Sequence, residues 1–363
     1  MSVSFEMSSQ VFAEVVASAR LAPSADNTQP WSFERMGAGM QVYISRERML
    51  PTDVANMFSW IAVGAAVENI VLSVSKREQG TEVDLPRGEG AVAANGDVLA
   101  ASLSFFSGAT PDALVNWIER RVSNRRPYDD EPLAQSELSI LARAAGTGVG
   151  VHWVREKSER QIFADLMASC DRTRLEYRPF HEELFAILRL SEEEARRRGD
   201  GLSLASLEIP ESEVPMLQAM SDYATCEAAN EKGFSRELAR GGATGAVKAG
   251  AVGILSVPTA TPAAWIEAGR AFQRVWLRAT ERGFAFQPIG GLPQFLTRLA
   301  LAPDTFTSEH RQRMEGIMPA LHELVPGLRG RALSVMFRVG KCDAPPSGRS
   351  YRLPTERLLR SAS

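Results

Sequence analysis

A basic segment near the middle of the chain has the residue types of a phosphate-binding site. Residues 120–132 read RRVSNRRPYDDEP, so four arginines and a serine lie within seven positions. In an extended segment alternate side chains point the same way, so Arg121, Ser123 and Arg125 would converge. Two guanidinium groups and a hydroxyl suit a phosphate monoester. The alternative is a solvated basic run that pairs with the acidic residues 129–131.

A polar turn near the N-terminus offers a second group of ligand-binding side chains. Residues 22–33 read APSADNTQPWSF, and Pro23 is expected to stop the helix before them. Ser24, Asn27 and Gln29 supply one hydroxyl and two amides, which can match a ring with alternating donors and acceptors. The alternative is an ordinary turn that closes a helix.

A glycine turn later in the chain could bring backbone close to a planar ligand. Residues 287–291 read QPIGG, and the sequence predicts that this turn follows a helix. Glycines at 290 and 291 leave room for backbone N–H groups to approach a ligand edge. The alternative is a helix C-cap followed by a turn.

Composition excludes several classes of protein. The 363 residues carry a net charge of −3, with 41 basic against 44 acidic side chains, so neither nucleic acid nor a membrane is expected as partner. Three distant cysteines and four scattered histidines lack zinc or disulfide spacing, so we expect no metal and a reducing compartment. The longest apolar stretch, 60–74, is shorter than the roughly 20 residues that span a bilayer. We expect a cytoplasmic protein without a signal peptide.

Hydrophobic periodicity predicts the elements that must position these residues. Helices are expected at residues 9–21, 59–76, 136–145 and 265–282, with a charge-rich helical region at 157–198. Strands are expected at residues 31–36, 40–45, 98–105, 149–154, 251–257 and 333–340. Residues 199–250 contain scattered glycine, serine and proline and are expected to be less regular. The pattern predicts an α+β fold.

Two of the expected helices share an internal repeat. Residues 64–72 and 269–277 both read G-x-A-apolar-[EQ]-[NR]-apolar-apolar-L. Small residues allow close approach between helices, and the aliphatic positions seek a core. One interpretation is a duplicated half with one core helix in each copy. The alternative is that any two buried helices can share such a pattern.

Together these segments resemble the nitroreductase-like flavoprotein family. APSADNTQPWSF is similar to the family's APS-x-x-N-x-QPW-x-F signature, and RRVSNRR to its R-x-S-x-[RK] segment. The resemblance implies that Arg121, Ser123 and Arg125 hold the phosphate of FMN. The remaining site residues implied by the family pattern are Ser24, Asn27 and Gln29 at the polar edge of the flavin ring, Pro288, Ile289, Gly290 and Gly291 beneath its reactive edge, and Arg349 and Arg352 near the phosphate.

The order of these segments departs from the ordinary family pattern. Ordinary members open with the Arg-Ser segment, whereas here the APS turn comes first. Each half of the chain therefore keeps what the other lacks, which implies an intramolecular pseudo-dimer with one flavin site. We expect two related halves, residues 1–112 and 113–363, each with a central antiparallel sheet flanked by helices. Residues 199–250 would form a lid, and the protein would be a monomer or weak homodimer.

The resemblance implies an FMN-dependent oxidoreductase. Hydride would pass from NAD(P)H through flavin N5 to a small acceptor such as a nitroaromatic or a quinone. No general acid or base is assigned, because the flavin carries the chemistry. The alternatives are a non-catalytic protein that sequesters FMN beneath a lid, and a flavin-free interaction protein that keeps only the scaffold.

Overall fold

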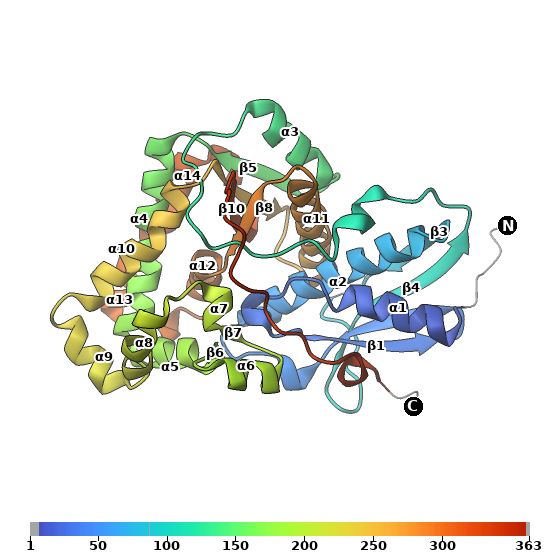
Figure 1. Cartoon of the computed structure of the whole chain (residues 1–363), viewed down its shortest axis with the longest axis horizontal. Coiled ribbons are helices and arrows are strands. Elements are labelled where there is room, and N and C mark those ends of the chain that lie inside the picture. Colours follow the sequence, from blue (N-terminus) through green and yellow to red (C-terminus); the bar gives the residue numbers. More distant parts are fainter. Residues whose placement is uncertain (1–6, 87, 361–363) are drawn as a thin grey trace.

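The computed structural model describes residues 7–86 and 88–360 and contains two four-stranded antiparallel sheets (Figure 1). The first sheet has the order β1-β2-β4-β3, with β1 (Trp31–Met36), β2 (Gly39–Ile44), β3 (Gln79–Asp84) and β4 (Val98–Ser107). The second has the order β5-β8-β10-β9, with β5 (Gly150–Val154), β8 (Ala251–Val257), β9 (Ala285–Ile289) and β10 (Ala332–Gly340). A short parallel pair, β6 (Leu188–Arg189) and β7 (Leu202–Ser203), lies apart from them. The predicted α+β class is confirmed.

Both sheets have the same strand topology. In each, the strands are ordered first, second, fourth, third along the chain, and one helix connects the second strand to the third. These helices are α2 (Met57–Ser75) and α11 (Pro262–Glu281). They pack against each other at the centre of the molecule, between the two sheets (Figure 1).

Two glycines set the distance between these helices. A Cβ atom built on Gly64 would lie 2.0 Å from the carbonyl oxygen of Ile266. A Cβ atom on Gly269 would lie 1.9 Å from the carbonyl oxygen of Ile61. Any larger side chain at either position would force the backbones apart. The close helix approach predicted from the repeat is therefore confirmed.

Polar contacts fix the register of the same helix pair. Glu68, only 1% exposed, accepts hydrogen bonds from Arg270 Nε at 3.0 Å and Arg274 Nη1 at 2.8 Å. Gln273 Nε2 donates to Asn69 Oδ1 at 2.6 Å. These polar positions of the repeat face each other across the interface, so sliding one helix along the other would leave a buried carboxylate unpaired.

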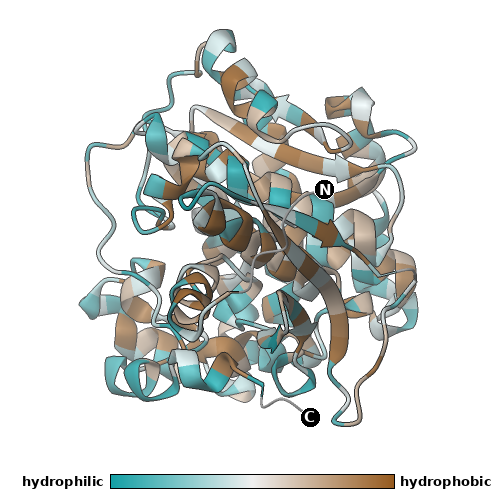
Figure 2. Ribbon diagram, turned by 90° about the vertical axis from the view of Figure 1, so that its right-hand side faces the viewer, coloured by the Kyte–Doolittle hydropathy of each residue, from teal (hydrophilic) through white to brown (hydrophobic). Residues whose placement is uncertain are grey.

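The hydrophobic core is continuous across both sheets. Trp31 and Phe33 from the first sheet and Trp276 and Phe337 from around the second belong to one buried cluster. Figure 2 shows the hydrophobic residues along the strands and inner helices. The stretch Val54–Ser75 is long and apolar enough to cross a membrane, but 89% of its most apolar window is buried in the fold. Its composition is that of a core helix.

The remaining helices flank the sheets or fill long connections of the second sheet. Those beside the sheets are α1 (Ser9–Ala19) and α3 (Gln135–Ala144). Those between β5 and β8 are α4 (Lys157–Glu176), α5 (Arg178–Ile187), α6 (Glu192–Arg198), α7 (Leu204–Leu207), α8 (Val214–Ala219), α9 (Tyr223–Asn230) and α10 (Phe234–Val247). Those between β9 and β10 are α12 (Gly291–Leu301), α13 (Ser308–Glu315) and α14 (Ile317–Leu324).

The expectation of an irregular segment at 199–250 is wrong for its second part. Helices α9 and α10 occupy much of it, and α10 packs along α4. One glycine of α10 is closely packed: a Cβ atom on Gly245 would lie 3.1 Å from the guanidinium carbon of Arg338. Tertiary packing here outweighs weak helix propensity.

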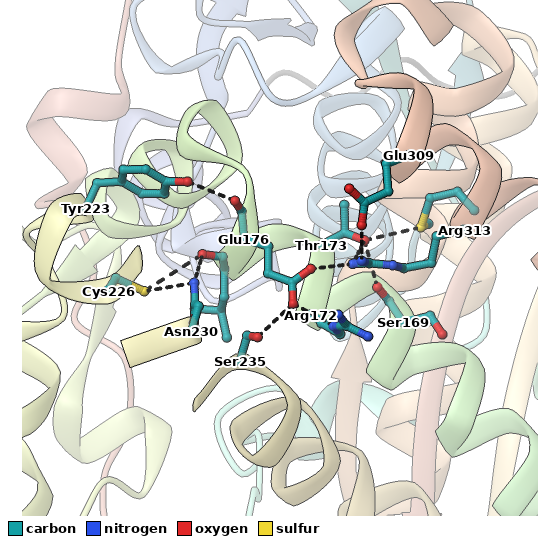
Figure 3. Close-up of polar contacts among 12 residues, drawn as sticks. Ser169, Arg172, Thr173, Glu176, Tyr223, Cys226, Asn230, Ser235, Glu309 and Arg313 are labelled. Atoms are coloured by element: carbon teal, nitrogen blue, oxygen red, sulfur yellow. Dashed lines mark hydrogen bonds and ion pairs between the residues drawn. The ribbon is translucent and has the colours of Figure 1, made fainter. Parts of the chain in front are cut away.

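A polar cluster around Glu176 joins these helices (Figure 3). The Glu176 carboxylate accepts from Arg172 Nε at 2.6 Å, Arg313 Nη1 at 2.8 Å and Ser235 Oγ at 2.9 Å, while its backbone oxygen accepts from Tyr223. Burial acts to raise the pKa of Glu176, but the hydrogen bonds from both arginines outweigh it and lower the pKa. The cluster anchors α9 and α10 to α4 and α13.

The segment after β10 crosses from the second sheet to the first (Figure 1, dark red). Its residue Gly348 lies beside α7, where an added Cβ atom would be 3.4 Å from the Cβ of Ala205. Farther on, Arg360 N donates to the carbonyl oxygen of Phe33 at 2.9 Å, and Leu359 forms a parallel bridge with Phe33. The segment therefore ties both sheets together.

Candidate functional site

Most of the predicted site residues meet at one cavity of about 250 Å³. Those that line it are Ser24, Asn27, Arg121, Ser123, Arg125, Pro288, Gly290, Gly291 and Arg352. Arg349 instead lines an adjoining cavity of about 190 Å³, which shares Arg121, Ser123, Arg125 and Arg352 with the first. Gln29 and Ile289 are buried and line neither cavity. Segments far apart in the sequence thus surround one space.

Among the described residues, the basic side chains of the two adjoining cavities form no ion pair with a carboxylate. Within residues 7–86 and 88–360, this holds for Arg121, Arg125, Arg349 and Arg352, although Asp26 interacts electrostatically with Arg125. Their hydrogen-bond acceptors are neutral oxygens, such as Leu21 O, 2.6 Å from Arg121 Nη2. A buried cation without a paired counter-ion is costly, so the burial of Arg121 favours an anionic ligand.

Arg121 is the most deeply placed of these side chains. Its guanidinium carbon lies 4.3 Å from the ring centroid of Trp276, and its buried Nε has no partner. Burial lowers the pKa of Arg121 well below its usual range, and the nearby charges of Arg352 and Arg349 lower it further. An unsatisfied donor on a buried cation marks the point where an anion oxygen would be stabilised most.

Arg125 and Arg352 extend this positive region. Burial, then repulsion from Arg20 and Arg349, lowers the pKa of Arg352 to about 10. Burial also lowers the pKa of Arg125. With a pKa of about 10, Arg352 stays charged at neutral pH and adds a positive charge to the cavity.

The turn at residues 24–29 has an unusual backbone. Asp26, Asn27 and Gln29 have φ values of 51°, 54° and 51°, in the left-handed region. Asn and Asp tolerate this region better than most residues. Ser24 Oγ accepts from Gln29 N at 3.0 Å, which closes the turn. The backbone of this turn therefore favours Asp26 and Asn27 at their positions.

Two of the predicted ring-binding amides are engaged with the protein itself. Asn27 Nδ2 donates to Tyr351 O at 2.9 Å, and Asn27 Oδ1 accepts from Arg352. Gln29 Nε2 donates to Gly199 O at 2.8 Å, and its Oε1 accepts from Leu353 N at 2.9 Å. These amides hold the C-terminal segment and the start of the 199–250 segment against the turn.

The glycine turn at 288–291 differs from its prediction. Pro288 and Ile289 end strand β9, Gly290 precedes α12 and Gly291 begins it, so the turn follows a strand rather than a helix. The strand was missed because Pro288 cannot donate to a ladder; β9 is an edge strand, where proline is tolerated. A Cβ atom on Gly291 would lie 3.2 Å from Arg174 Nη2.

Several cavity residues were not predicted from the sequence. These are Asp26, Phe58, Arg174, Trp276, Gln294 and Ser350. Asp26 lies inside the predicted turn and could have been suspected from its position. Arg174 lies on α4 in a charge-rich region, where no spacing distinguishes it from solvated arginines. Burial raises the pKa of Asp26, although Arg174 and Arg125 act to lower it.

The structure is an α+β protein with two four-stranded antiparallel sheets and a cavity lined by several arginines. Residues 118–302, just over half of the chain, match the family model described as Nitroreductase family. The chain belongs to the nitroreductase family, which confirms the resemblance.

Other known proteins are similar over long stretches. An uncharacterized protein of Mycobacterium tuberculosis is 27% identical over 350 residues, covering 93% of this chain and 46% of the relative. The chain therefore spans about half the length of that curated relative. The structure of the FMN-dependent nitroreductase NfnB from Mycobacterium smegmatis, in complex with NADPH, is also similar. The two chains are 17% identical, and the match covers 68% of this chain and 97% of the NfnB chain, with a TM-score of 0.38. An FMN-bound nitroreductase of Desulfitobacterium hafniense is 14% identical. The match covers 69% of this chain and 99% of that nitroreductase, with a TM-score of 0.35.

Proposed function

We propose that this protein is an FMN-dependent oxidoreductase. The observation that carries the proposal is the group of arginines at one cavity without carboxylate partners. Arg121, Ser123 and Arg125 would bind the FMN phosphate, with Arg352 and Arg349 adding positive charge. A phosphate oxygen would satisfy the orphan Nε of Arg121. Membership of the nitroreductase family supports this ligand.

The flavin ring would extend from the phosphate site toward the glycine turn. Ser24 and the turn held by Asn27 and Gln29 would face its polar edge, while the backbone from Pro288 to Gly291 would lie beneath its reactive edge. Gly290 has no atom within 4 Å of an added Cβ, so space exists on that side. When bound, FMN would accept a hydride from NAD(P)H and reduce a small acceptor such as a nitroaromatic or quinone.

We further propose that the chain is an intramolecular pseudo-dimer with halves at residues 1–112 and 113–363. The shared strand order and the reciprocal contacts of Gly64 and Gly269 support two related halves. The cavity draws residues from both, which is expected when each half keeps a different part of the site. One FMN per chain follows from this proposal, and we propose a monomer or weak homodimer in the cytoplasm.

A second candidate function is FMN storage without turnover. Leu202 and Leu207, from the proposed lid at 199–250, line the cavity, and Gln29 binds Gly199 at the start of that lid. A lid held this way would shield the flavin from NAD(P)H. Stopped-flow mixing with NADH and NADPH separates the two functions, because only the oxidoreductase would be reduced.

Cofactor analysis tests the first proposal directly. Purified protein should be yellow, and chromatography of the released cofactor should give FMN at about one per chain. Two flavins per chain would contradict the pseudo-dimer, and FAD in place of FMN would contradict the phosphate assignment. A protein that cannot be loaded with FMN would overturn the proposed function.

A further inference from the structure

The candidate FMN cavity adjoins two further pockets. A small pocket of about 20 Å³, here called the neck, shares lining residues with the cavity and with a larger chamber of about 620 Å³. Asp26 lines the cavity, the neck and the chamber. Arg174 and Gln294 line the cavity and the neck, whereas Thr52 and Glu183 line the neck and the chamber. Asp26 and Arg174 therefore lie where the cavity meets the neck.

Most polar groups in the neck are already satisfied. Glu183 forms a bidentate ion pair with Arg298, with both N–O distances at 2.7 Å. Gln294 Oε1 accepts from Arg174 Nη2 at 3.0 Å, and Gln294 Nε2 donates to Thr52 O at 3.4 Å. These side chains therefore serve to hold the walls of the neck.

Asp26 is the free acceptor of the neck. In the described parts of the chain its carboxylate makes no hydrogen bond and no ion pair, although it interacts electrostatically with Arg174 and Arg125. Its backbone, at φ 51°, is fixed by the turn around it. The carboxylate is thus held at the neck with its oxygens available to a donor.

Arg174 is the matching donor. Gln294 binds one of its guanidinium nitrogens, and its guanidinium carbon lies 5.3 Å from the ring centroid of Phe295. It forms no ion pair within residues 7–86 and 88–360, so other N–H groups remain for a ligand. Its Nη2 lies 3.2 Å from the Cβ position of Gly291, beside the proposed reactive edge.

We propose that Asp26 and Arg174 together recognise a primary carboxamide on an aromatic ring, the group that a nicotinamide carries. The carboxamide oxygen would accept from Arg174, and its NH₂ group would donate to Asp26. A carboxylate in the same place lacks a donor and is repelled by Asp26. This inference rests on the proposed FMN function and assigns the residues that select its second substrate.

Benzamide and benzoate provide a matched pair of probes. They share a ring and shape but differ in whether the substituent can donate a hydrogen bond. Titration of the FMN-loaded protein with each, followed by the visible flavin spectrum, gives both dissociation constants. Wild type should bind benzamide at least about tenfold more tightly than benzoate.

Two variants separate the roles of the pair. Asp26→Asn removes the negative charge and keeps a residue type that tolerates the left-handed backbone. It should lower the ratio of benzamide to benzoate affinity by about tenfold, because benzoate binding improves. Arg174→Gln should weaken both probes by about tenfold. In stopped-flow experiments Arg174→Gln should also raise the NAD(P)H concentration needed for half-maximal reduction, while reduction by dithionite is unchanged. Arg178→Gln is the control, because Arg178 is an exposed arginine of the next helix.

The possible failures can be told apart. A wild type that keeps FMN but binds benzoate as tightly as benzamide overturns this inference and leaves the proposed function intact. The same holds if Asp26→Asn keeps the full preference for benzamide. A protein that does not retain FMN overturns both.

Discussion

Gly64 and Gly269 are reciprocal contacts of one helix pair: each faces the carbonyl oxygen of the residue three positions before the other. The paired residues are Ile266 and Ile61, at distances of 2.0 and 1.9 Å from the respective Cβ positions. Reciprocity of this kind is the property of an isologous interface, in which the same surface patch is used twice. Here both patches belong to a single chain.

Gly269→Ala should destabilise the protein by at least about 1–3 kcal/mol, because the methyl group would overlap backbone atoms of α2. Urea denaturation followed by circular dichroism measures this change. Gly241→Ala is the matched control: Gly241 also lies in a helix, with no atom within 4 Å of an added Cβ. That variant should raise the free energy of unfolding by about 0.4–1 kcal/mol. Equal effects at both positions would refute the close-packing argument.

Arg125→Ala should weaken FMN binding by roughly ten- to a hundredfold, since a charge-assisted hydrogen bond contributes about 1.5–3 kcal/mol. Riboflavin, which lacks the phosphate, should bind wild type and variant equally. Fluorescence quenching of each flavin gives both affinities. Arg120→Ala, at an exposed arginine outside the cavity, is the control. Unchanged FMN affinity in the double variant of Arg121 and Arg125 would show that this segment does not bind the phosphate.

Leu207→Ala should speed the reduction of bound FMN by NAD(P)H several-fold without releasing FMN. The smaller side chain would shield the cavity less from NAD(P)H. Stopped-flow absorbance at the flavin band measures the rate. Leu301→Ala, at a leucine that is 55% exposed on α12, should leave it unchanged. A slower reaction in Leu207→Ala would instead place Leu207 in the substrate pocket. If neither wild type nor variant is reduced, the storage function holds.

Asp53 should make the protein less stable as the pH rises from about 4 to 6. Burial raises its pKa from 3.8 to about 6, although hydrogen bonds from Phe58 N and Ser59 act to lower it. The folded state therefore binds more protons than the unfolded state in this range, and the stability gained at low pH is lost as Asp53 ionises. The free energy of unfolding of the wild type should therefore contain a contribution from Asp53 that falls by about 1–3 kcal/mol between pH 4 and pH 7. Asp53→Asn should remove this contribution, as measured by urea denaturation at both pH values.

The elements with strong local signals could be predicted from the sequence. Strand β1 at 31–36 and strand β8 at 251–257 match their predicted bounds, since apolar and β-branched runs end at clear turns. Strand β3 was missed because QGTEVD is polar and lies at the edge of its sheet. Helix α10 was missed because its glycines lower the helix propensity of the segment, and tertiary packing stabilises the helix.

The candidate site could be predicted only in part, for a comparable reason. Arg121, Ser123 and Arg125 lie close in sequence, so their convergence follows from local spacing. Arg174 comes from a distant helix, and nothing in its neighbours along the chain marks it. Asn27 and Gln29 were predicted to face the polar edge of the flavin ring, but the sequence could not show that the segment containing Tyr351 and Leu353 occupies their amides.

The crossing of the C-terminal segment has a consequence for biosynthesis. Arg352 and Ser350 complete the wall of the cavity, and Leu353 is fixed by Gln29 from the opposite end of the chain. All strands of both sheets precede these residues in the sequence, but a nascent chain that lacks them has an unfinished cavity. Cofactor loading would therefore follow release of this segment from the ribosome, so the supply of FMN would act on finished chains rather than guide their folding.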